Sequence, residues 1–91
     1  MTRAEQLLKE AKTMIREAKE KSFEEYFKSR CEIPNNQYLK ECYLTEYNNA
    51  RNNIVVIRTT QKNISEIQKL GKVEIIVTSG VKNSHYKVKV S

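Results

Sequence analysis

Apolar side chains recur every three or four residues near the start of the chain, which is the spacing of one face of an amphipathic helix. The positions are Ala4, Leu7, Leu8, Ala11, Met14, Ile15 and Ala18. Thr2 and Glu5 have the spacing of a capping box, so the helix is predicted to begin at the N-terminus. The pattern favours packing of this stripe on the protein's own sheet. The alternatives are docking on a partner or a homodimer through the helix.

A second capping box, Ser22-x-x-Glu25, allows a break near residues 20–22 and a second short helix. The alternative is one continuous helix to about Arg30 that protrudes and pairs with a partner. The second short helix would turn Phe23, Tyr26, Phe27 and Cys31 inward. No Gly or Pro interrupts residues 1–33, so this whole segment is predicted to be helical.

The middle segment, residues 34–53, is compatible with two structures. Leu39, Cys42, Tyr43 and Tyr47 share a helical stripe, whereas Tyr38, Lys40, Cys42 and Leu44 alternate as in a strand. We favour a helix over residues 37–47, followed by a loop at Asn48–Asn53. If the segment were a hairpin, its exposed tyrosines would offer a stacking platform for bases.

The last segment, residues 54–91, has the pattern β-α-β-β. Ile54–Thr59 is β-branched and apolar on both faces, which predicts a central strand. Residues 60–70 form a short helix closed by Gly71, and Lys72–Thr78 and His85–Val90 are strands joined by a turn. The chain is therefore predicted to be one α+β domain over residues 1–91, with N-terminal helices packed on a sheet of about three strands.

Charge is distributed unevenly. The net charge of +6 is concentrated in residues 54–91, which carry seven basic and two acidic side chains, while residues 1–33 are close to balance. This asymmetry indicates an anionic partner for the C-terminal half. The plain alternative is that the charge only keeps a small domain in solution.

The final strand offers the best candidate binding residues. Lys87, Lys89 and His85 share one of its faces, with successive cations about 7 Å apart, close to the spacing of backbone phosphates. The opposite face holds Tyr86, Val88 and Val90 and is expected to be buried. The predicted nucleic-acid-binding residues are Lys72, Lys82, Lys87 and Lys89, with Arg58, Lys62 and Lys69 as weaker candidates. The alternative for Lys87 and Lys89 is a guard against aggregation on an exposed edge strand.

Composition excludes several kinds of chemistry. The chain has two cysteines, one histidine and no aspartate, so an Asp-based triad cannot be built. An intrachain zinc-finger site is excluded unless a glutamate is recruited or the protein dimerises. Its two glycines cannot form a phosphate-binding loop. We expect no cofactor, no metal and no enzymatic activity; a metal-independent ribonuclease using His85 with Glu74 or Arg58 is the remaining enzymatic alternative. Cys31 and Cys42 are expected to pack as small apolar side chains.

No apolar run is long enough for a membrane span or a secretion signal, so a cytoplasmic protein without a membrane partner is expected. The favoured function is binding of nucleic-acid backbone, with weak sequence preference, through the basic C-terminal half. The alternative function is a protein-protein effector, an inhibitor or adaptor, that binds an acidic partner.

Overall fold

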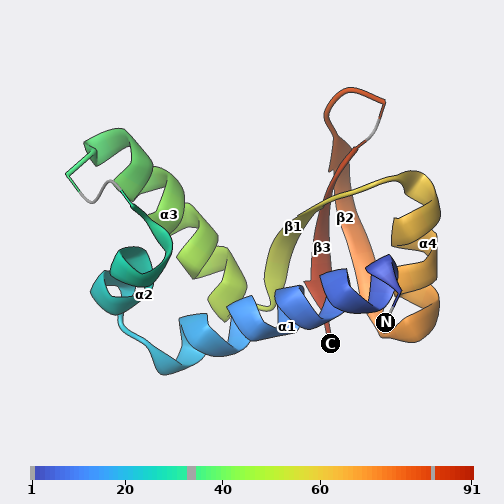
Figure 1. Cartoon of the computed structure of the whole chain (residues 1–91), viewed down its shortest axis with the longest axis horizontal. Helices are drawn as coiled ribbons and strands as arrows, with labels where there is room; N and C mark the ends of the chain where they lie inside the picture. Colours follow the sequence, from blue (N-terminus) through green and yellow to red (C-terminus); the bar gives the residue numbers. More distant parts are fainter. Residues whose placement is uncertain (1, 33–34, 83) are drawn as a thin grey trace.

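The computed structural model describes residues 2–32, 35–82 and 84–91 and shows an α+β fold (Figure 1). Helices make up the N-terminal part, and an antiparallel sheet lies in the C-terminal part. In chain order the elements are α1 (Arg3–Glu20), α2 (Phe23–Arg30), α3 (Gln37–Arg51), β1 (Ile54–Arg58), α4 (Gln61–Leu70), β2 (Val73–Ser79) and β3 (His85–Val90). The predicted fold class and the β-α-β-β order of the second half are confirmed.

Each of these helices begins where a polar side chain accepts a hydrogen bond from the helix's first turn. The pairs are Thr2 with the Glu5 N–H (3.2 Å), Ser22 with the Glu25 N–H (3.3 Å), Asn36 with the Leu39 N–H (3.1 Å) and Thr60 with the Asn63 N–H (3.3 Å). These bonds satisfy donors that a helix start otherwise leaves unpaired. The predicted break at residues 20–22 is confirmed, because α1 ends at Glu20 and α2 begins after Ser22.

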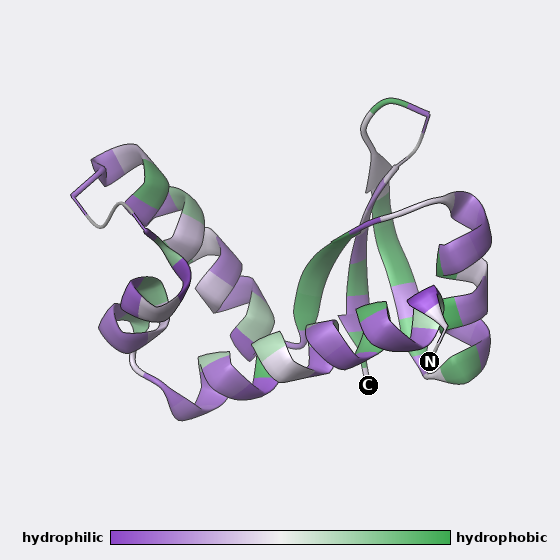
Figure 2. Cartoon of the chain, in the orientation of Figure 1, coloured by the Kyte–Doolittle hydropathy of each residue, from purple (hydrophilic) through white to green (hydrophobic). Residues whose placement is uncertain are grey.

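The apolar stripe of α1 is buried in the protein's own core. All of its predicted members are buried except Met14, which is half-buried and packs against the core. In Figure 1, α1 crosses the foot of the sheet and continues to the helices α2 and α3. Figure 2 shows polar residues on the outward sides of the helices. The stripe therefore packs mainly on the protein's own sheet and helices, as expected.

Aromatic side chains hold α2 against α3. The Phe23 ring lies 5.6 Å from that of Tyr47, and the Phe27 ring lies 5.6 Å from that of Tyr43, measured between ring centroids. The Tyr47 hydroxyl donates to the Lys21 carbonyl (2.7 Å), and the Tyr43 hydroxyl donates to the Arg30 carbonyl (3.2 Å). These contacts explain why the middle segment forms the favoured helix rather than a hairpin.

The helix in the middle segment runs further than predicted. α3 continues to Arg51, so the expected loop at Asn48–Asn53 is wrong for its first four residues. Asparagine is a weak helix former, but burial of Tyr47 and Ala50 in the core stabilises the last turns. The chain turns only at Asn53, whose φ of 64° is left-handed.

The strand order β1-β3-β2 corrects two expectations. β1 is an edge strand and not central, and its Val56 is 54% exposed. β3 is the central strand, paired antiparallel on both sides, so Lys87 and Lys89 do not guard an edge. The prediction for β1 was wrong because a run of residues that is apolar on both faces is typical of a central strand. Here only Val55 and Ile57 of β1 point into the core.

Candidate functional site

One face of the sheet packs on the helices, and the opposite face is largely exposed. Register places three rows of side chains across that face: Arg58, His85 and Ser79; Val56, Lys87 and Val77; and Ile54, Lys89 and Glu74. A bulge between Ile75 and Val77 adds Ile76. We call the surface formed by these ten residues (Ile54, Val56, Arg58, Glu74, Ile76, Val77, Ser79, His85, Lys87 and Lys89) the open face.

The middle of the open face is apolar. Val56, Ile76 and Val77 are 54%, 45% and 49% exposed, and Lys87 lies between Val56 and Val77 in the central strand. Arg58 and Lys89 flank this apolar centre, and Glu74 is the carboxylate of the face, directly across from Lys89. The open face therefore combines an apolar centre with mainly basic side chains around it.

The structure brings together only some of the seven predicted binding residues. Three of them, Arg58, Lys87 and Lys89, share the open face. Lys72 directly precedes β2, at the end of the sheet where Lys89 lies, and the Lys72 carbonyl accepts a hydrogen bond from the Ser91 N–H. Lys82 lies in the β2–β3 turn with a left-handed φ of 57°. Lys62 and Lys69 lie on α4, which packs on the other side of the sheet. The seven cations therefore do not form one patch.

Strand register places one of the two expected partners, Arg58, beside His85. Arg58 lies directly across from it on β1, but Glu74 is opposite Lys89, at the other end of the strand. The His85 Nδ1 lies 3.2 Å from the Ser84 hydroxyl. Among the described residues no carboxylate is placed to act with this imidazole.

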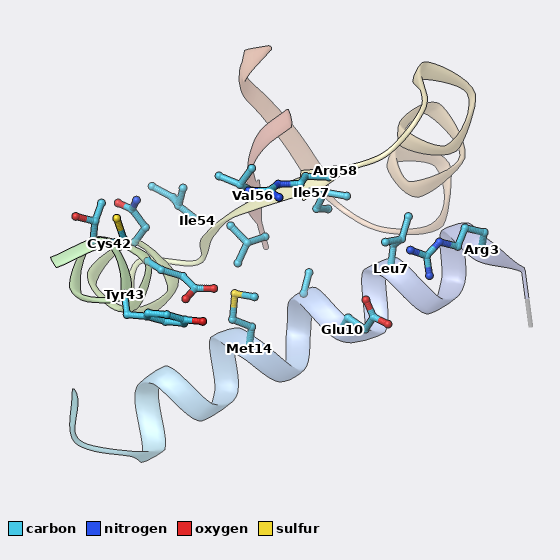
Figure 3. A pocket seen from close by; sticks show the side chains of 15 residues that line it. Arg3, Leu7, Glu10, Met14, Cys42, Tyr43, Ile54, Val56, Ile57 and Arg58 are labelled. Carbon is cyan, nitrogen blue, oxygen red and sulfur yellow. The ribbon is translucent and has the colours of Figure 1, made fainter. Parts of the chain in front are cut away.

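A cleft of about 640 Å³, which the sequence did not reveal, runs beside β1 (Figure 3). Its described lining comes from three elements: Arg3, Leu7, Glu10, Ala11 and Met14 of α1; Cys42, Tyr43, Thr45, Glu46 and Asn49 of α3; and all five residues of β1. On both helices these residues have helical spacing, the signal that could have indicated two walls. Cys42 is exposed here, contrary to expectation, while Cys31 is buried as predicted.

Glu46 is the electrostatically unusual group of this cleft. Burial raises the pKa of its carboxyl above the ordinary value, and Arg30 and the Tyr26 hydroxyl lower it only in part. Burial, and then the Glu46 carboxylate, raise the pKa of Tyr26. The two groups affect each other, although their geometry falls short of a hydrogen bond and the buried Tyr26 hydroxyl has no partner among the described residues.

Arg30 is already engaged close to this pair. Its guanidinium lies 3.5 Å from the Glu17 carboxylate and 5.3 Å from the centre of the Tyr26 ring. Among the described residues, Glu46 therefore forms no ion pair of its own. It is a half-buried carboxyl with a raised pKa, and the exposed thiol of Cys42 lines the same cleft one helical turn earlier on α3.

Among the described residues, no group of three or more His, Cys and Glu side chains is arranged to hold a metal ion. None of the described helices combines the length and the apolar character needed to cross a membrane. No protein-family model, curated protein or solved structure matches this chain.

Proposed function

We propose that this protein is a non-enzymatic binding protein whose open face docks an acidic partner protein. The observation that carries the proposal is the exposure of Val56, Ile76 and Val77 around Lys87. Exposed apolar patches with a polar surround are typical of protein interfaces. Covering three half-exposed aliphatic side chains contributes roughly 3 kcal/mol, which is less than association costs.

The charged side chains around the apolar centre add electrostatic complementarity to the apolar contact. Arg58, Lys87 and Lys89 outnumber Glu74 on the open face, so a partner carrying carboxylates around an apolar contact is electrostatically complementary. A purely solubilising role for the lysines does not account for the aliphatic side chains between them.

Nucleic-acid backbone is the second candidate. The row of His85, Lys87 and Lys89 favours it, because this row lies on the central strand and faces outward. Against it, the open face has no aromatic side chain for stacking, since Tyr86 is buried on the other face. The protein partner therefore fits the open face better.

The test compares two double charge reversals. Lys87→Glu with Lys89→Glu alters the open face, while Lys62→Glu with Lys69→Glu makes the same change of charge on α4, on the other side of the sheet. After nuclease treatment, a stoichiometric protein partner should be captured by wild type and by the α4 variant but not by the open-face variant. Equal capture by both variants would refute docking at the open face.

Titration with short single- and double-stranded DNA and RNA at two salt concentrations tests the second candidate. Binding that weakens steeply with salt in wild type, and whose salt slope falls by about two in the open-face variant, would favour nucleic acid.

A further inference from the structure

The free edge of β1 carries unpaired backbone groups. The Asn53 carbonyl accepts from the Val90 N–H (2.8 Å), and the Thr59 N–H donates to the Ser84 carbonyl (3.0 Å). In an antiparallel ladder the backbone groups of every second residue point toward the partner strand, so the N–H and C=O groups of Val55 and Ile57 also point toward β3. The N–H and C=O groups of Ile54, Val56 and Arg58 therefore point away from the sheet. No described residue gives these groups a hydrogen bond.

This edge forms one wall of the cleft. The cleft's described lining comes from β1, α1 and α3, so it lies on the side of β1 away from β3. In Figure 3 the α1 side chains Leu7 and Met14 lie across the cleft from the strand, and α3 closes one end. Leu7 and Ala11 are buried and Met14 is half-buried, so the α1 wall is largely apolar.

We propose that this cleft takes up one extended segment of a partner protein, which adds to β1 as a fourth strand of the sheet. β1 is about 17 Å long, so five extended residues match it. Ile54, Val56 and Arg58 offer three donors and three acceptors to such a segment. Strand addition of this kind draws affinity from the backbone and specificity from alternate side chains. The proposal goes beyond the open face and does not depend on it.

A second copy of this chain does not fit the cleft. In a second copy, α1 and α3 contact β1 in the same way, so pairing of the two β1 edges would bring the helices of both chains against each other. Two chains of net charge +6 would also repel. The occupant is therefore a segment without flanking helices.

The charges of the cleft define the segment's chemistry. In Figure 3, Arg3 and Glu10 on the α1 wall and Arg58 on the strand lie away from the end of the cleft that holds Tyr43. A carboxylate is favoured beside Arg58 on the strand side and disfavoured beside Glu10 and Glu46, which also line the cleft. The matching segment alternates apolar side chains toward α1 and carries its acidic residue beside Arg58.

The first test selects random peptides of about ten residues, displayed on phage, against the immobilised full chain. Val56→Pro removes the outward N–H and leaves every N–H that pairs with β3, a change that edge strands tolerate. Val56→Thr is the matched control, because it changes the side chain and keeps the N–H. Selected peptides should bind the threonine variant as they bind wild type and the proline variant at least about 10-fold more weakly. Enrichment of no peptide, or equal binding to the proline variant, would overturn the proposal.

Hydrogen exchange on wild type supplies a readout that needs no variant. A bound peptide should slow exchange of the Val56 and Arg58 amides by about 10-fold or more and leave those of Val55 and Ile57, already paired with β3, nearly unchanged. Protection without this alternation would reject strand addition. The Lys87→Glu, Lys89→Glu variant should bind the selected peptides as tightly as wild type does. Loss of docking at the open face can therefore be distinguished from loss of strand addition in the cleft.

Discussion

Replacing Tyr47 with phenylalanine isolates the contribution of one hydroxyl to the joint between α1 and α3. Tyr47 is buried, and its hydroxyl donates to the carbonyl of Lys21, the C-cap of α1, while accepting from the Arg51 guanidinium (2.9 Å). The ring, which packs 5.3 Å from that of Tyr26, is retained in phenylalanine. Any loss of stability is therefore due to the hydrogen bonds.

The expected loss follows from the surroundings of the two partners. The bond to the Lys21 carbonyl is short and partly buried, so its removal costs about 1 kcal/mol. Arg51 is exposed and regains water, which adds only a few tenths of a kcal/mol, about as much as an exposed ion pair contributes. A total near 1.3 kcal/mol lowers Tm by roughly 6 °C in a chain of this size. In urea, the midpoint should fall without a change in m.

Tyr43→Phe is the matched control. Its hydroxyl makes a single bond of 3.2 Å to the Arg30 carbonyl and the side chain is only half-buried, so the loss should be smaller. A Tyr47→Phe protein as stable as wild type, or less destabilised than Tyr43→Phe, would refute the role assigned to Tyr47.

Three further substitutions test the core and the cleft. Glu46→Gln should raise Tm at neutral pH and leave Tm unchanged below pH 4.5, the ordinary pKa of the carboxyl. The reason is that the folded protein has the higher carboxyl pKa, so its stability falls as the pH rises through that pKa. An equal change of Tm at both pH values would contradict the burial of this charge. Gly80→Ala should lower the free energy of unfolding by at least about 1–2 kcal/mol, because φ is 86° and the new methyl collides with the His85 imidazole. Adding His85→Ala should recover only the part of this loss that is due to the collision. Full recovery of stability would exclude backbone strain. Val88→Ala in the core should cost about 2 kcal/mol by urea denaturation, whereas Val56→Ala on the open face should cost under about 1 kcal/mol; similar costs would contradict the assignment of the two faces.

Signals confined to a few residues could be read from the sequence. The capping residues Thr2 and Ser22 mark helix starts because the hydrogen bonds that define a start join residues three positions apart. The alternation of His85–Val90 likewise sorts buried from exposed side chains, because each residue's face depends only on its neighbours along the strand.

Features that depend on distant partners could not be predicted. Nothing in Ile54–Arg58 shows that its free edge meets a cleft, because β1 pairs with β3, which lies about thirty residues later in the chain. The end of α3 was missed for a related reason, since Ala50 is held in the helix by burial in the core and not by local propensity. The cleft itself joins stripes from α1 and α3, and each stripe taken alone resembles an ordinary half-exposed helix surface.

The charge asymmetry shows the same limitation. Lys62 and Lys69 contribute to the basic C-terminal half as much as Lys87 and Lys89 do, but α4 carries them to the opposite side of the sheet. Net charge along the sequence therefore overstated the size of any single basic surface.

Val56 is where the two proposed sites meet, and it allows them to be separated. Its side chain belongs to the open face, while its N–H and C=O groups belong to the free edge. Val56→Asp adds a negative charge beside Lys87 and should abolish docking of an acidic partner, whereas Val56→Pro leaves an apolar side chain and removes the edge donor. If one partner uses both surfaces, each substitution should weaken its binding and the two effects should combine. If the surfaces serve different partners, each substitution should affect one partner and spare the other.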